Sequence, residues 1–278
     1  MIDILKDTLI DGIKLIPFLF LAFLIIELIE HKLTTKNKKV IVKAGKFGPI
    51  LGSVLGIFPQ CGFSVMATNL YVTRIVSLGT LIAIYLSTSD EMLPILLSQN
   101  VEISIILKIL LTKVIIGMIS GFIIDIVLRK KTNKKLDYEI CQEEKCHCEK
   151  NIFLSSLKHT LNITAFLMVA TFILNVLIEF TGITENNSII FNNIFTPFLT
   201  SLIGLLPNCA SSVMITTLYT SGVISFSSLI SGLLTGSGVA ILVLFKTNKN
   251  IKENILILSL IYSIGVISGL IIELVGIL

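Results

Sequence analysis

The sequence GIFPQCGFSVMAT at residues 56–68 is followed 148 residues later by GLLPNCASSVMIT at residues 204–216. Both copies keep the pattern Gly-x-x-Pro-(Gln/Asn)-Cys-x-x-Ser-Val-Met-x-Thr. Residues 47–71 and 195–219 are identical at 13 of 25 positions at this offset. The same offset later aligns Gly117 with Gly265 and Gly121 with Gly269. The sequence therefore predicts two repeats that together cover nearly the whole chain.

The composition indicates a membrane protein. Of the 278 residues, 54% are hydrophobic and only 14% are charged, whereas soluble domains carry about 25% charged residues. Several apolar runs approach the roughly 20 residues that cross the hydrocarbon core of a bilayer. The short alternating segments of a β-barrel do not appear. We expect an all-α polytopic protein that spans the plasma membrane several times.

The basic residues predict how the repeats are oriented. Most of them lie in residues 32–46, 129–158 and 246–252, and the positive-inside rule places these loops in the cytoplasm. The loop after the first span is basic in the first half, but its counterpart in the second half has no Lys or Arg. Equivalent loops therefore face opposite sides, as in the inverted repeats of secondary transporters. We expect a first repeat at 1–128, a cytoplasmic linker at 129–158 and a second repeat at 159–278.

Inversion requires an odd number of crossings in each half, so residues 47–97 must make a net single crossing. Their length suits a re-entrant hairpin followed by one span, with the tip at residues 59–62. Proline breaks a helix because it lacks an N–H and clashes with the preceding turn. Irregular backbone at membrane depth is tolerated where it is buried in protein or lines a cavity. Three short spans in this stretch, giving five per half, are the alternative.

Two sets of polar residues are candidates for a substrate site near the membrane midplane. The first comes from the two hairpin tips: Gln60, Cys61, Ser64, Asn208, Cys209 and Ser212. The alternative for these is a kinked helix with an inert, buried cysteine. The second set interrupts the following span: Ser89, Asp90 and Glu91 in the first half and Ser237 in the second.

Carboxylates within a span are costly and are functional by default. Lys113, in the next span, is the candidate to neutralise Asp90 or Glu91 and to couple transport to proton movement. A closed pair that only locks helices together, or carboxylates in an outer vestibule, are the alternatives. Carboxylate and amide oxygens favour Mn(II), whereas Cys61 and Cys209 favour softer ions or trivalent metalloids. The residues leave both possibilities open.

The linker contains a further candidate metal site. Three Cys and one His fall within eight residues and could supply four soft ligands: Cys141, Cys146, His147 and Cys148. The alternative is a charged linker whose thiols happen to cluster. No Walker, dinucleotide-binding or zincin motif appears, so we expect no cofactor, no ATP drive and no enzyme. The basic residues flank apolar spans, so we expect no nucleic-acid partner. The sequence leaves open whether the protein forms a homo-oligomer.

Taken together, these motifs resemble the ten-helix heavy-metal exporter family. The resemblance rests on the paired Pro-(Gln/Asn)-Cys elements, the Ser-Thr-Ser-Asp-Glu-Met stretch at 87–92, its Thr-Gly-Ser-Gly counterpart at 235–238 and the Cys/His linker. It covers almost the whole chain, and members of that family are labelled manganese transporters or arsenic efflux permeases. The hairpin arrangement predicted here departs from a literal count of ten spans.

The resemblance implies export of a metal or metalloid ion. We predict a secondary active transporter that exports a heavy-metal ion, Mn(II) first, by alternating access. The alternative substrate is trivalent arsenic or an organoarsenical, bound by Cys61 and Cys209. Alternatives of a different class are a membrane thiol oxidoreductase that uses the same two cysteines, and an ion channel.

Overall fold

The computed structural model describes residues 47–57, 61–89, 92–128, 195–207 and 209–275, with isolated positions at 16–24 and 153–172. These residues form helices and connecting turns, and the described ranges contain no strand. The all-helical class predicted from the sequence is confirmed. The first-half helices are α3 (Gly48–Leu55), α4 (Cys61–Val72), α5 (Leu78–Ser87), α6 (Met92–Ser98) and α7 (Ile103–Leu128). The second-half helices are α10 (Thr196–Gly204), α11 (Cys209–Thr220), α12 (Phe226–Thr235), α13 (Ala240–Thr247) and α14 (Ile251–Val275).

The sequence repeat is also a structural repeat. Every second-half helix begins 148 residues after its counterpart, and the pairs α4/α11 and α5/α12 also end at this offset. The same local signals recur in both halves. Ser77 and Ser225 accept a hydrogen bond from the backbone N–H three residues later and so cap α5 and α12. Proline occupies the first turn of α3 and of α10, where its missing N–H costs nothing.

Helices α3 and α4 form a hairpin. A Cβ on Gly48 would lie 2.1 Å from Thr80 Oγ1, and one on Gly56 would lie 2.0 Å from Ser87 Oγ. Helix α3 therefore runs parallel to α5. Helix α4 leads into α5 through residues 73–77, so the end of α4 lies on the same side as the start of α3.

The second half repeats this hairpin with α10 and α11. Ser231 Oγ donates to Pro197 O at 2.8 Å, and Thr235 Oγ1 donates to Ser201 O at 2.8 Å. Both partners of the second bond lie four residues further along the chain than those of the first, so α10 and α12 run in the same direction. Because α11 is joined to α12 through residues 221–225, it returns to the side from which α10 starts.

Each hairpin is followed by a helix that is broken in its middle. Helices α5 and α6 are separated by residues 88–91, and α12 and α13 by residues 236–239. Three segments of the described chain are long and apolar enough to cross a membrane: Ile103–Leu128, Phe226–Thr247 and Ile251–Val275. The broken segment Phe226–Thr247 is 83% buried, against 28% and 33% for the two continuous helices. The broken segment is therefore enclosed, and the continuous helices lie outside it.

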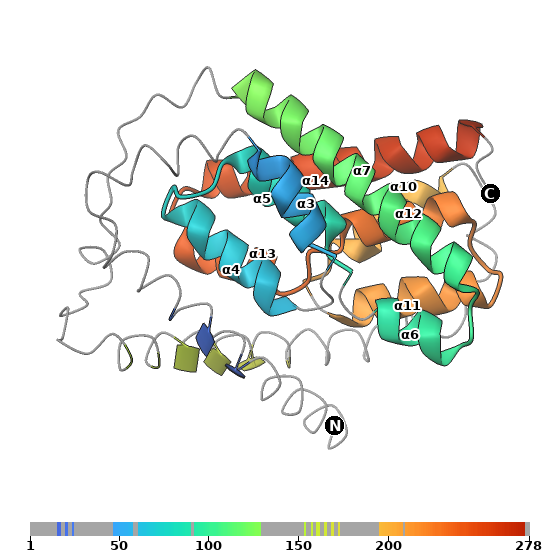
Figure 1. The fold of residues 1–278 in the computed structure, drawn as a ribbon, viewed down its shortest axis with the longest axis horizontal. Coiled ribbons are helices and arrows are strands. Elements are labelled where there is room, and N and C mark those ends of the chain that lie inside the picture. The colour runs from blue at the N-terminus through green and yellow to red at the C-terminus, as the bar shows by residue number, and fades with distance from the viewer. Residues whose placement is uncertain are drawn as a thin grey trace.

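Helices α7 and α14 run in opposite directions. Asp125, near the end of α7, accepts a hydrogen bond from the backbone N–H of Gly79 at the start of α5, at 2.9 Å. Arg74, just before α5, pairs with Glu253 at the start of α14. The end of α7 and the start of α14 therefore share one side of the molecule (Figure 1).

Helices of the two halves also pack against each other. Helix α4 packs on α13, and α6 packs on α11. These two mixed pairs lie at opposite ends of the molecule (Figure 1). Each hairpin therefore packs against the broken helix of the other half.

Candidate functional site

Lys113 lies in the middle of α7 and is only 1% exposed. Its ammonium donates hydrogen bonds to the main-chain oxygen of Thr88 and, at 3.0 Å, to that of Leu233. Thr88 is the C-cap of α5, and Leu233 lies in the last turn of α12. The C-terminal end of a helix carries partial negative charge, which a cation complements. The C-terminal ends of α5 and α12, one from each half, therefore meet at one buried ammonium.

This charge has no counterpart in the second half. The position 148 residues after Lys113 is Ile261, which is fully buried and apolar. The acidic pair Asp90 and Glu91 corresponds likewise to Gly238 and Val239. Among the described residues, the buried ammonium of Lys113 is therefore a feature of the first half that the nearly symmetric second half does not repeat.

The two predicted serines of the breaks differ in their bonding. Ser89 Oγ donates to Ile57 O at 2.6 Å, which ties the first break to the turn of the first hairpin. Its counterpart Ser237 is fully buried, and its hydroxyl has no hydrogen-bond partner among the described residues. Buried polar groups nearly always have a partner. The second break therefore presents a hydroxyl that is free to accept a ligand.

The hairpin arms bring the predicted motif residues to matching places. Cys61 and Cys209 are the first residues of α4 and α11. One turn later, Ser64 and Ser212 are both buried. In each half the motif threonine, Thr68 or Thr216, donates back to the serine carbonyl at 2.7 Å.

Sequence reasoning missed Tyr85, whose hydroxyl lies at the junction of the two halves. It is 2.5 Å from Thr68 Oγ1 and 3.5 Å from Ala240 O, the first residue of α13. Tyr85 sits in an unbroken apolar run, so nothing in the sequence singled it out. The carbonyls of Thr88 and Leu233 were also missed, because every residue has a main-chain oxygen and the residue type does not show which one will be used.

Several predicted ligands lie outside the described residues. These are Gln60, Asp90, Glu91, Asn208, Cys141, Cys146, His147 and Cys148, together with the side chains of Cys61 and Cys209. Within the described ranges, no group of three or more His, Cys, Asp or Glu could hold a metal ion. The predicted metal ligands are therefore not placed, and the described part of the site consists of Lys113, hydroxyls and main-chain oxygens.

A charged cluster lies away from the centre, where α4 ends and α14 begins. Glu253 accepts hydrogen bonds from Arg74, from the Tyr71 hydroxyl and, at 3.4 Å, from Asn248. The hydrogen bond to Glu253 raises the pKa of Arg74 above its ordinary value, so this guanidinium stays charged. The cluster is an electrostatic clasp between the two halves, remote from Lys113.

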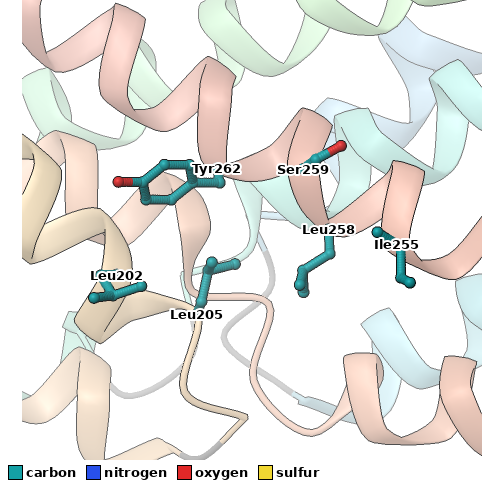
Figure 2. Close-up of a pocket in the computed structure, with 6 residues that line it drawn as sticks. All are labelled: Leu202, Leu205, Ile255, Leu258, Ser259 and Tyr262. Carbon is teal, nitrogen blue, oxygen red and sulfur yellow. The ribbon is translucent and has the colours of Figure 1, made fainter.

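A groove of about 230 Å³ lies on the outer surface between α10 and α14 (Figure 2). Its lining is Leu202, Leu205, Ile255, Leu258, Ser259 and Tyr262. Two of these, Leu202 and Ile255, are more than half exposed. An apolar groove without a charged side chain cannot hold an ion, so the central junction remains the candidate site.

The comparison with known families is consistent with this structure, a buried polar junction within an apolar helical frame. The chain matches the model of the family described as "Putative, 10TM heavy-metal exporter" over residues 1–193 and 164–277. The chain belongs to this family. No curated protein and no solved structure matches it. The resemblance seen in the sequence is confirmed, and the family supports metal efflux across a membrane rather than an enzymatic reaction.

Proposed function

We propose that this exporter is a secondary active transporter that carries Mn(II) out of the cytoplasm by alternating access at the central junction. The observation that supports this most is the position of Lys113, whose ammonium contacts main-chain oxygens at the C-terminal ends of α5 and α12, one from each half. Transporters with inverted repeats bind substrates near the midplane, at the repeat interface, where broken helices expose carbonyls. The junction lies between the two halves and presents main-chain oxygens from the ends of α5 and α12, which supports this proposal.

The opposite directions of α7 and α14 favour inverted repeats. In this proposal the α3–α4 and α10–α11 hairpins enter from opposite faces, and the broken helices cross between them. The repeats occupy 1–128 and 159–278, and the linker 129–158 lies in the cytoplasm, where Cys141, Cys146, His147 and Cys148 would capture metal before export. The protein resides in the plasma membrane.

The described polar groups at the junction are oxygens and one ammonium, which favours a cation that prefers oxygen ligands. Asp90 directly follows Ser89 in the chain, and Glu91 precedes α6. We assign both carboxylates to the metal or to proton exchange against it. Lys113 balances their charge. Gln60, Asn208, Ser64 and Ser212 line the approach from the hairpins.

The second candidate substrate is trivalent arsenic. The supporting observation is that Cys61 and Cys209 begin the equivalent helices α4 and α11. Each thiol therefore follows directly on a hairpin turn. Thiolates bind soft metalloids better than hard divalent cations, so this reading places the substrate on the two sulfurs.

Flux into liposomes that contain the purified full-length protein separates the two candidates. Asp90→Asn and Glu91→Gln should each reduce Mn(II) flux by about tenfold or more, while Cys61→Ser and Cys209→Ser leave most of it. Glu102→Gln, an exposed carboxylate next to α7, is the matched control and should transport normally. Loss of As(III) flux in the cysteine variants, with Mn(II) flux absent from the unmodified protein, would replace the manganese proposal with the arsenical one.

A further inference from the structure

The ammonium of Lys113 occupies the kind of place that a bound metal ion would take. It is buried in the interior of the protein and donates hydrogen bonds to main-chain oxygens at two helix ends. A buried charge requires such partners because leaving water is costly. Main-chain carbonyls are also common ligands of hard divalent cations. An ammonium and a metal ion would therefore compete for the same oxygens.

We propose that the main-chain oxygens of Thr88 and Leu233, together with Ser237 Oγ, form the cation site, and that Lys113 fills this site when no substrate is bound. This inference deepens the proposed function, on which it rests, by naming the atoms that hold the ion and by defining the ligand class as a small cation that prefers oxygen. A thiol-bound metalloid would not compete with Lys113.

The repeat supports this assignment. Thr88 and Gly236 are equivalent positions that follow α5 and α12, and the frame offers similar helix ends from both halves. Lys113 has no equivalent in the second half, where Ile261 occupies the corresponding position. The Lys113 ammonium therefore contacts the ends of both α5 and α12, and it lies between the two halves.

Ser237 provides an independent observation that points to a ligand here. Its hydroxyl is fully buried and lacks a partner within the described residues, whereas the equivalent Ser89 is bonded to Ile57 O. Ser237 lies four residues after Leu233, whose carbonyl already holds the ammonium. A cation between these groups would satisfy the unused oxygen.

Mutual exclusion of the lysine and the substrate has a mechanical consequence. The Lys113 ammonium bridges the end of α5 in the first half to the end of α12 in the second. An incoming ion displaces the ammonium and so removes this bridge. Substrate binding would then release one half from the other at the place where alternating access requires movement.

The first test removes the lysine and refills the site. Lys113→Ala should lower the melting temperature of the purified full-length protein, and millimolar methylammonium should raise it again by several degrees. The unmodified protein and Lys108→Ala, an exposed lysine on the same helix, should respond to methylammonium only as they do to sodium chloride. A response of Lys113→Ala no larger than that of the unmodified protein would overturn the proposal.

A second measurement does not depend on that variant being stable. Lys113→Met keeps most of the side-chain volume but removes the competing charge. Its Mn(II) affinity should exceed that of the unmodified protein by about tenfold, because a site that is already filled is only partly available. Adding Ser237→Ala should reverse much of this gain. Unchanged or weaker Mn(II) binding by Lys113→Met would contradict the mutual exclusion.

The two tests also separate this inference from the proposed function. Rescue of Lys113→Ala by methylammonium, with no Mn(II) binding by any variant, would support the cation site and contradict manganese as the substrate. Mn(II) transport by the unmodified protein, with no rescue and no gain of affinity in Lys113→Met, would support the proposed function and contradict this site.

Discussion

Arg74 and Glu253 form a bidentate ion pair that joins the two halves of the molecule. Arg74 Nη1 lies 2.7 Å from Glu253 Oε1, and Nη2 lies 3.0 Å from Oε2. The Tyr71 hydroxyl donates to the same carboxylate, and the guanidinium lies 5.2 Å from the centre of the Tyr71 ring. The equivalent positions on the opposite side are Gly222 and Ile105, which cannot form such a pair. This clasp therefore holds one side of the molecule only.

Breaking the clasp should cost a modest amount of stability. Arg74→Ala and Glu253→Ala should each lower the free energy of unfolding by about 1 kcal/mol, because Arg74 is 44% exposed and the pair is partly screened by solvent. The double variant should lose less than the sum of the two. Lys252→Ala, next to Glu253, is the control. Thermal unfolding in detergent measures the effect, and strictly additive losses would show that the two residues are not coupled.

The contact between α5 and α7 should not tolerate a methyl group. A Cβ on Gly79 would lie 2.1 Å from Gly121 O, and one on Gly121 would lie 2.6 Å from Gly79 O. Small residues let two helix backbones approach this closely. Gly79→Ala and Gly121→Ala should each lower the unfolding free energy by about 2 kcal/mol. At Gly236 the nearest atom would be 3.6 Å away, so Gly236→Ala should fold normally, and equal losses at all three sites would contradict this packing account.

Asp125 should stabilise the folded protein through its hydrogen bonds to the start of α5. Its carboxylate accepts hydrogen bonds from Ser77 Oγ at 2.7 Å and from the backbone N–H of Gly79 at 2.9 Å. A carboxylate at a helix N-terminus is favourable because of the helix dipole. Asp125→Asn should therefore lower the unfolding free energy by about 1 kcal/mol. Glu102→Gln, an exposed carboxylate, should change it much less, and a similar loss in both variants would argue against this role.

The two equivalent serines of the helix breaks should respond differently to removal of the hydroxyl. Ser89→Ala loses the bond to Ile57 O and should lower the unfolding free energy by about 1 kcal/mol. Ser237→Ala removes a buried hydroxyl without a partner among the described residues and should be neutral or slightly stabilising in the absence of substrate. Thermal unfolding of the metal-free protein distinguishes the two, and a larger loss for Ser237→Ala would contradict the asymmetry.

The repeat was predictable from sequence because the same turn chemistry occurs twice. Gly56 is the C-cap of α3, its counterpart Gly204 is the last residue of α10, and the capping serines Ser77 and Ser225 recur at the same offset. The same local signals occur at the ends of equivalent helices in both halves. Gly117 and Gly121 also recur at this offset, as Gly265 and Gly269, and the structure places the first pair against Ala83 O and Gly79 O.

The pairing of α4 with α13 and of α6 with α11 was not predictable. It depends on how two repeats cross in space, and no local pattern in one helix records which helix of the other repeat will cover it. The clasp between Arg74 and Glu253 joins residues 179 positions apart and was missed for the same reason. Lys113 was found because a charge within an apolar span stands out, but its main-chain partners carry no such mark.

The most direct test of metal export is the total metal content of cells, measured by elemental mass spectrometry with and without expression of the protein. A sensitive host would be challenged separately with Mn(II), Zn(II), Cd(II) and As(III). We predict that expression selectively lowers cellular manganese and that Asp90→Asn expressed at the same level does so much less. Loss of arsenic alone would move the substrate to Cys61 and Cys209, and unchanged content of all four elements would contradict metal export by this protein.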